Sequence, residues 1–178
     1  RLTRDEVPSE TGEIYDRYVK QRGHMPHMFR TVAHRPEIFP TMIAHLEAIL
    51  NTRTLPIKLK ELVIVRTSQL NHCDYCLASH LRIAKRLGCG DDQLLHLEDY
   101  ALRNDFTLRE RTGLRLAELM TRNERPLTDE EWQELRDVFS EGEIVELMAA
   151  IGLFNYFNRF NNLLGMEATA PAALQAAQ

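Results

Sequence analysis

The fold is decided by residues 61 to 88, which read Glu61-Leu-Val-Ile-Val-Arg-Thr-Ser-Gln-Leu-Asn71-His-Cys73-Asp-Tyr75-Cys76-Leu-Ala-Ser-His80-Leu-Arg-Ile-Ala-Lys-Arg-Leu-Gly88. In this stretch the two cysteines are three residues apart, and the histidine follows the second cysteine by four residues. Positions i, i+3 and i+7 lie near one face of an α-helix, which has about 3.6 residues per turn. The spacing therefore predicts that a dithiol and an imidazole share one wall.

The start of this helix determines how reactive the cysteines are. Asn71 is a favourable N-cap residue, Asp74 suits a first turn, and Gly88 favours termination. These signals place Cys73 and Cys76 in the first turn of the helix. Unpaired backbone N–H groups and the positive end of the helix dipole stabilise a thiolate there, so the sequence indicates reactive thiols.

These residues also carry a resemblance to a known family. The spacing of Glu61, Cys73, Cys76 and His80 resembles the alkylhydroperoxidase D-like branch of the carboxymuconolactone decarboxylase family. A looser resemblance extends over roughly residues 29 to 165. It implies an all-α, single-domain helical bundle of the alkylhydroperoxidase D-like type, which assembles as a homo-oligomer, a trimer or a hexamer.

The resemblance implies a thiol-dependent hydroperoxide reductase. In that mechanism Cys76 attacks the peroxide, Cys73 then forms a disulfide with it, and Glu61 and His80 relay protons with a bound water. An external dithiol, carried by a lipoyl or thioredoxin-like protein, would restore the thiols. One position departs from the pattern, because members of this branch often have a histidine where this chain has Tyr75.

Composition excludes several other classes. The chain has 178 residues, 44% of them hydrophobic, and a net charge of −4 with acids and bases interspersed, so nucleic acid is not an expected partner. No run of 18 apolar residues occurs, and we expect no membrane span. An odd number of cysteines, three, with one Cys-x-x-Cys pair, indicates a reducing compartment, and we expect the cytoplasm. The chain shows no flavin, haem or nucleotide motif, so we expect no cofactor.

The rest of the chain reads as one all-helical domain over residues 1–168, followed by an Ala-rich tail over 169–178 that we expect to be disordered. Three capping boxes mark helix starts in the second half. Helices are predicted over 9–22, 28–34, 37 or 40 to 50, 56–70, 91–102 and 141–164, with the boxes at Thr107/Glu110, Thr128/Glu131 and Ser140/Glu143.

Two of these helices are apolar on nearly every face and should be buried. The helix from Pro56 carries Glu61 about one turn from its start, and a buried carboxylate there would need a partner and would be a useful base. The last helix keeps one polar stripe, Asn155, Asn158, Arg159 and Asn162. We interpret the stripe as a solvated face, with the border of the active site as the alternative.

Other readings of the motif stay open. The two cysteines are also compatible with small buried side chains, or with a zinc site in which His80 is the third ligand and His72 or Glu61 the fourth. We expect no metal, because zinc sites usually draw two separated ligand pairs. A lactone decarboxylase-like enzyme and a non-catalytic redox sensor are the alternative functions. Cys89 and the remaining histidines are interpreted as incidental.

Overall fold

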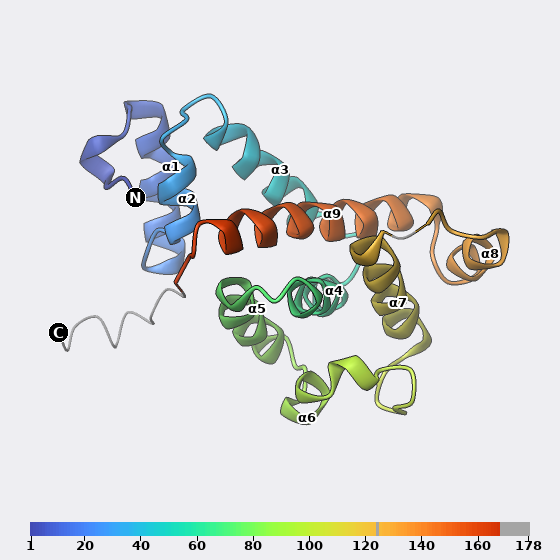
Figure 1. The fold of residues 1–178 in the computed structure, drawn as a ribbon. Coiled ribbons are helices and arrows are strands. Elements are labelled where there is room, and N and C mark those ends of the chain that lie inside the picture. Colours follow the sequence, from blue (N-terminus) through green and yellow to red (C-terminus); the bar gives the residue numbers. More distant parts are fainter. Residues whose placement is uncertain (124, 168–178) are drawn as a thin grey trace.

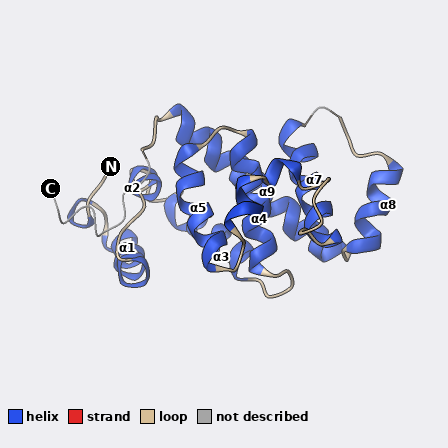
Figure 2. Cartoon of the chain, turned by 90° about the horizontal axis from the view of Figure 1, so that it is seen from below, coloured by secondary structure: helices blue, strands red, loops and turns tan. Residues whose placement is uncertain are grey.

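The structure is a computed structural model, and it describes residues 1–123 and 125–167. The described residues are helical throughout and form no strand (Figure 2), so the all-α prediction is confirmed. The predicted tail lies outside the described residues. The helices are α1 (Ser9–Arg22), α2 (His27–Val32), α3 (Phe39–Asn51), α4 (Ile57–Leu70), α5 (Asp74–Arg86), α6 (Asp91–Leu95), α7 (Leu108–Arg122), α8 (Asp129–Val138) and α9 (Glu141–Leu163).

Helix α4 is the centre of the bundle. It packs against α5, α7 and α9, and Figure 1 shows it between α5 and α7, with α9 running across it. Every residue from Leu59 to Ser68 is buried, as the pattern of apolar residues on all faces predicts. Leucine, isoleucine and valine side chains of α4 enter all three hydrophobic clusters of the fold. The helix that carries Glu61 is thus held from every side.

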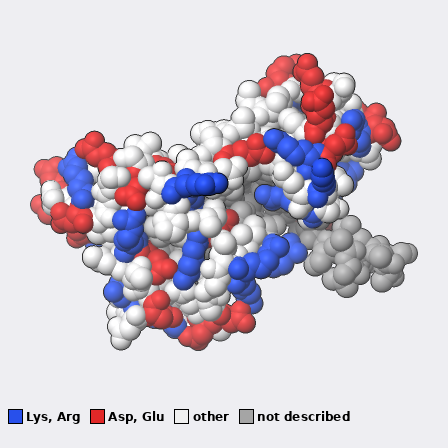
Figure 3. All heavy atoms as spheres, turned by 180° about the vertical axis from the view of Figure 1, so that it is seen from behind, with Lys and Arg blue, Asp and Glu red and all other residues white. Residues whose placement is uncertain are grey.

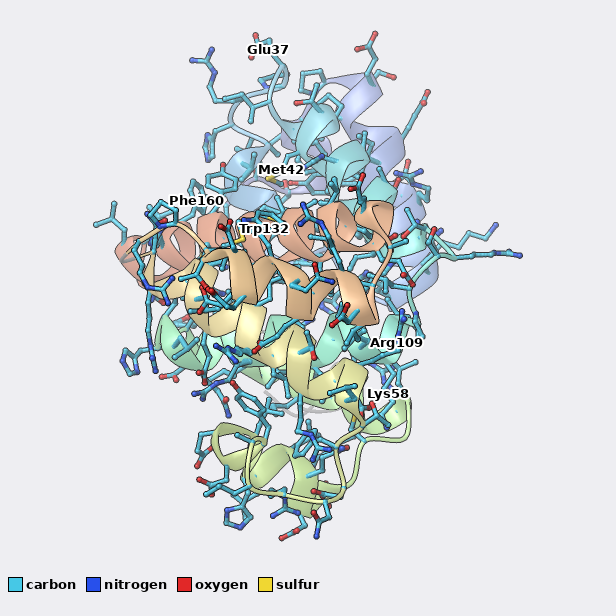
Figure 4. All side chains as sticks on the ribbon, turned by 90° about the vertical axis from the view of Figure 1, so that its right-hand side faces the viewer. Glu37, Met42, Lys58, Arg109, Trp132 and Phe160 are labelled. Carbon is cyan, nitrogen blue, oxygen red and sulfur yellow. The ribbon has the colours of Figure 1, made fainter. Side chains whose placement is uncertain are left out.

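The three clusters divide the core among different helices. The first joins α1, α2 and α3 to α9 and includes Met42, with Phe160 packed against it. The second lies among α4, α7, α8 and α9, and Trp132 packs against it. The third lies among α4, α5, α6 and α7. Figure 4 labels Met42 and Phe160 of the first cluster and Trp132 of the second.

Helix boundaries follow the local signals in most places. All three capping boxes form, each with the Ser or Thr side chain accepting from the third backbone N–H and the Glu side chain accepting from the cap N–H. The predicted helix over 91–102 is wrong, because α6 ends at Leu95 and a short 3₁₀ turn, Leu97–Asp99, follows. The chain turns here to bury Leu97 and Tyr100, while Leu102 is left 88% exposed.

The surface agrees with the charge pattern of the sequence. Acidic and basic side chains are mixed over the face seen in Figure 3. Among the described residues, no helix combines the length and the apolar character needed to cross a membrane.

Candidate active site

The junction between α4 and α5 positions the two cysteines. Asn71 ends α4 and does not begin α5, so its predicted role as N-cap is wrong. The N–H groups of Asn71 and Cys73 still bond to carbonyls of α4, at 3.1 Å to Thr67 and 3.0 Å to Ser68, because the chain continues to wind after the helix proper. At His72 the chain changes direction through a left-handed φ of 51°, which few residues other than glycine adopt. Cys73 then occupies the N-cap position of α5 and Cys76 its third residue, so both thiols do lie at the helix start.

A large cavity opens beside this junction. Its volume is about 540 Å³, within the range of small-molecule sites, about 300–1,000 Å³. Half of its lining residues are apolar, from α2, α3, α5 and α9 among others, and two exposed arginines, Arg22 and Arg53, also line it. Cys76, Glu61 and His80 lie in its wall. The cavity suits an organic molecule with an apolar body.

Glu61 and His80, which are 19 residues apart in the chain, form a direct pair. His80 Nδ1 donates to Glu61 Oε2 at 2.7 Å, so the bond joins α5 to α4. The Glu61 residue is only 2% exposed. The rings of His80 and Phe154 of α9 pack edge to face, with ring centroids 4.7 Å apart. Packing on one side and the carboxylate on the other fix the imidazole in orientation, as a proton-transferring group requires.

The two cysteines differ in access. Both are free thiols and buried, with Cys73 0% and Cys76 4% exposed. Cys76 lines the cavity, whereas Cys73 does not. The prediction that both thiols and the imidazole share one wall therefore holds for Cys76 and His80 but not for Cys73.

The two cysteines also differ in ionisation. A hydrogen bond from the Cys76 thiol lowers the pKa of Cys73 from 9.0 to about 6, with smaller contributions from the Cys76 backbone N–H and the Asn158 amide. The same contact, burial and the neighbouring charge raise the pKa of Cys76. The pair thus gives up its first proton near neutral pH and keeps the second. One negative charge is shared across the dithiol.

Helix α9 carries a row of three asparagines, and two of them, Asn158 and Asn161, contact the cysteines. Asn155, Asn158 and Asn161 are 7%, 0% and 1% exposed. Asn155 and Asn158 belong to the polar stripe that we interpreted as a solvated face, so that interpretation is wrong for these two residues. Asn158 Nδ2 donates to Ser68 Oγ at 3.1 Å, and Asn161 Nδ2 donates to Cys76 Sγ at 3.3 Å. No role was predicted for Asn161 from the sequence. Its signal was the three-residue spacing of three amides on an otherwise apolar helix.

The Tyr75 side chain makes a structural contact at the site. It is 8% exposed and lines the cavity, and its hydroxyl accepts a hydrogen bond from the Met28 backbone N–H at 3.2 Å. This bond ties α5 to α2, so Tyr75 helps to hold the N-terminal helices against the cavity.

The ligand set of a zinc site does not come together. The donor atoms of Cys73, Cys76 and His80 are not all within 4.8 Å of one another; among the described residues only those of His96, Glu98 and Asp99 meet that distance. Cys89 is buried in the third cluster, away from the cavity, and burial raises the pKa of its thiol.

Comparison with known proteins shows a related family. Residues 36–119 match the carboxymuconolactone decarboxylase family. The uncharacterized protein YdfG of Bacillus subtilis (strain 168) is 26% identical over 112 residues, which are 62% of this chain and 76% of YdfG.

Solved structures share the fold over nearly the whole chain. An uncharacterized peroxidase-related protein from Ralstonia eutropha JMP134, described as an alkylhydroperoxidase AhpD core, has a TM-score of 0.85 at 23% identity and covers 94% of this chain and 90% of its own. The debrominase Bmp8, solved with 2,3,4-tribromopyrrole, has a TM-score of 0.81 at 20% identity and covers 95% and 90%.

The fold and the site define an all-helical protein with a dithiol at one helix start and an acid–imidazole pair in the adjoining cavity. The chain is similar to the carboxymuconolactone decarboxylase family over residues 36–119 and has the alkylhydroperoxidase D-like fold.

Proposed function

We propose that the protein is a thiol-dependent hydroperoxidase that works through a disulfide cycle of Cys73 and Cys76. The observation that carries this proposal is the meeting of Cys76 with the Glu61–His80 pair in the wall of one cavity, half of whose lining residues are apolar. A nucleophile, a proton-transferring pair and room for an organic substrate are the parts that peroxide reduction needs. The family and the fold agree with this class without specifying the reaction.

In the first step the ionised sulfur of Cys76 attacks the distal oxygen of the hydroperoxide. An S–O bond forms and the O–O bond breaks, which oxidises Cys76 to a sulfenic acid and reduces the peroxide to an alcohol. The leaving alkoxide takes a proton from the Glu61–His80 pair through a bound water. The resemblance assigns the attack to Cys76, and the exposure of Cys76 to the cavity supports the same assignment, although Cys73 ionises more easily.

In the second step the Cys73 thiolate attacks the sulfur of the sulfenic acid. An S–S bond forms and the S–O bond breaks, and the hydroxyl leaves as water with the proton that Cys73 gives up on ionising. The Cys76 backbone N–H and the Asn158 amide, which contribute to the lowered pKa of Cys73, favour the thiolate in this role. An external dithiol, on a lipoyl or thioredoxin-like protein, reduces the disulfide by exchange and is itself oxidised. We also propose a homo-oligomer, a trimer or hexamer, as the working form.

Steady-state consumption of cumene hydroperoxide with dihydrolipoamide as reductant tests the cycle. We expect turnover in the unmodified protein and none in Cys76→Ser. Mass spectrometry after one equivalent of peroxide should find a sulfenic acid at Cys76 in Cys73→Ser and none at Cys73 in Cys76→Ser. Modification of Cys73 would exchange the two roles.

The same assays separate the alternative functions. A lactone decarboxylase-like activity that survives loss of both cysteines would contradict the disulfide cycle. Oxidation of the thiols once per chain, without turnover, would identify a redox sensor instead.

A further inference from the structure

One polar atom of the site has no partner. Asn161 is 1% exposed, lines the cavity and directs its Nδ2 to Cys76 Sγ at 3.3 Å. Its Oδ1 is buried and accepts no hydrogen bond, and it is the only such buried side-chain nitrogen or oxygen in the part of the chain that the structure describes. Buried polar groups are nearly always paired, so this acceptor calls for an explanation.

The neighbouring amides show that the fold can satisfy such atoms. Asn155 and Asn158 precede Asn161 at three-residue steps on the same face of α9. Their Oδ1 atoms both accept from Asn71 Nδ2, at 2.9 Å and 3.3 Å. The Oδ1 of Asn161 is the exception, and Asn161 differs from the other two residues in lining the cavity beside Cys76. An acceptor in that place suits a ligand that brings its own donor.

We propose that Asn161 forms the subsite for the O–H group of the hydroperoxide, its Oδ1 accepting from the distal hydroxyl while its Nδ2 remains on Cys76 Sγ. This inference rests on the proposed peroxidase function and deepens it. The two atoms of one planar amide would then hold the attacking sulfur and the attacked oxygen next to each other. Such positioning of two reacting atoms is a major source of catalysis.

The proposed contact fits the chemistry on both sides of the step. The sulfur takes the distal oxygen together with its hydrogen, the O–O electron pair leaves on the alkoxide, and the alkoxide takes its proton from the Glu61–His80 side. The O–H that bonds to Oδ1 in the substrate is therefore the S–O–H of the product. A thiolate can only accept hydrogen bonds, so Nδ2 on the sulfur suits the ionised cysteine.

The test compares two reagents on one sulfur. In the Cys73→Ser background, cumene hydroperoxide brings an O–H donor to Cys76, whereas methyl methanethiosulfonate brings neither O–H nor N–H. Both reagents need the same thiolate, so the ratio of their rates at one pH cancels any change in ionisation. Rates are measured by mass spectrometry of the Cys76 peptide, which separates it from Cys89.

Asn161→Leu should lower the ratio of the hydroperoxide rate to the thiosulfonate rate by about tenfold, the effect of losing one hydrogen bond in the transition state. Asn161→Asp keeps an acceptor oxygen but loses the N–H donor, so both rates should fall while their ratio stays near that of the parent. The matched control is Asn162→Leu. Asn162 is the next residue, exposed and bonded to the Asn71 carbonyl, and its loss should leave the ratio within about twofold.

An unchanged ratio in Asn161→Leu would overturn the subsite. A tenfold fall in Asn161→Asp equal to that in Asn161→Leu would also overturn it, because the acceptor is retained there. If cumene hydroperoxide forms no sulfenic acid in the parent while the thiosulfonate still labels Cys76, the proposed function itself fails. The two failures are therefore distinguishable.

Discussion

Lys60 and Glu61 are consecutive residues of α4, and both are buried, with 0% and 2% exposure. Successive residues point about 100° apart around a helix, so the two charges enter different surroundings. Lys60 Nζ lies 2.5 Å from a Glu146 carboxylate oxygen and donates to the carbonyls of Ile49 and Thr52 at 2.9 and 3.1 Å. Glu61 meets His80 and the cavity.

Burial serves the structure at Lys60, and at Glu61 it serves the proposed chemistry. The ammonium of Lys60 is surrounded by acceptors from α9, from the last turn of α3 and from Thr52 after it, so its charge joins α4 to α3 and α9. Glu61 shares its charge with a group that can itself take or give a proton, in a place that a substrate can reach. Burial alone does not mark a functional residue; the kind of partner and access to the cavity do.

The largest expected effect concerns stability on the Lys60 side. Lys60→Met leaves the Glu146 carboxylate without its buried cation, and we expect a loss of about 3–5 kcal/mol in the free energy of unfolding. Urea denaturation at pH 7 measures it. The double variant Lys60→Met/Glu146→Leu removes both charges and should recover much of the loss. A single variant as stable as the parent would contradict a structural role for the pair.

The next effect concerns activity on the Glu61 side. Glu61→Gln keeps the shape of the side chain but cannot carry the proton, so the rate of Cys76 oxidation by cumene hydroperoxide should fall by about 10²-fold or more. Stability should change little. Stopped-flow measurement of single-turnover oxidation checks the rate. Glu118→Gln is a matched control, because Glu118 pairs with Arg66 and does not line the cavity.

The pH dependence of the rate of Cys76 oxidation provides a second test of the role of Glu61. The thiolate is the reactive form, and the pKa of Cys73 is lowered to about 6, so the oxidation rate should rise with pH as the pair loses its first proton near 6. The groups that lower this pKa are the Cys76 thiol and N–H and the Asn158 amide, and Glu61 is not among them. Glu61→Gln should therefore lower the plateau and leave the midpoint in place. A shifted midpoint would mean that Glu61 acts by stabilising the thiolate.

Local patterns made much of this molecule predictable. The capping boxes depend on residues three apart, and the burial of α4 follows from apolar residues on every face, so both are visible in the sequence. Asn71 was misassigned because asparagine suits the end of a helix as well as its start. In this chain the N–H groups of Asn71 and Cys73 bond to carbonyls of α4, so Asn71 lies at the end of α4.

The site was predictable only in part, for a physical reason. Cys73, Cys76 and His80 lie on one helix, so their spacing reveals them, whereas Glu61 was recognised through a resemblance. Asn161 lies 85 residues after Cys76, on a helix with apolar residues on nearly every face, so the sequence does not reveal which face meets the sulfur. Contacts between distant elements depend on how helices pack, and periodicity within one helix does not contain that information.

Tyr75 shares one feature with Lys60 and one with Glu61, and its substitution should have the smallest effect on stability and activity. Like Lys60 it holds elements together, since its hydroxyl accepts from the Met28 N–H, and like Glu61 it lines the cavity. If its role is structural, Tyr75→Phe should cost about 1 kcal/mol in unfolding free energy through the loss of that bond. The rate of Cys76 oxidation should then stay within about twofold of the parent. Tyr100→Phe is a control away from the cavity, where the lost hydroxyl contact is to Glu118. A fall of tenfold or more in the rate, with stability unchanged, would instead assign Tyr75 to the proton relay, at the position where relatives often have histidine.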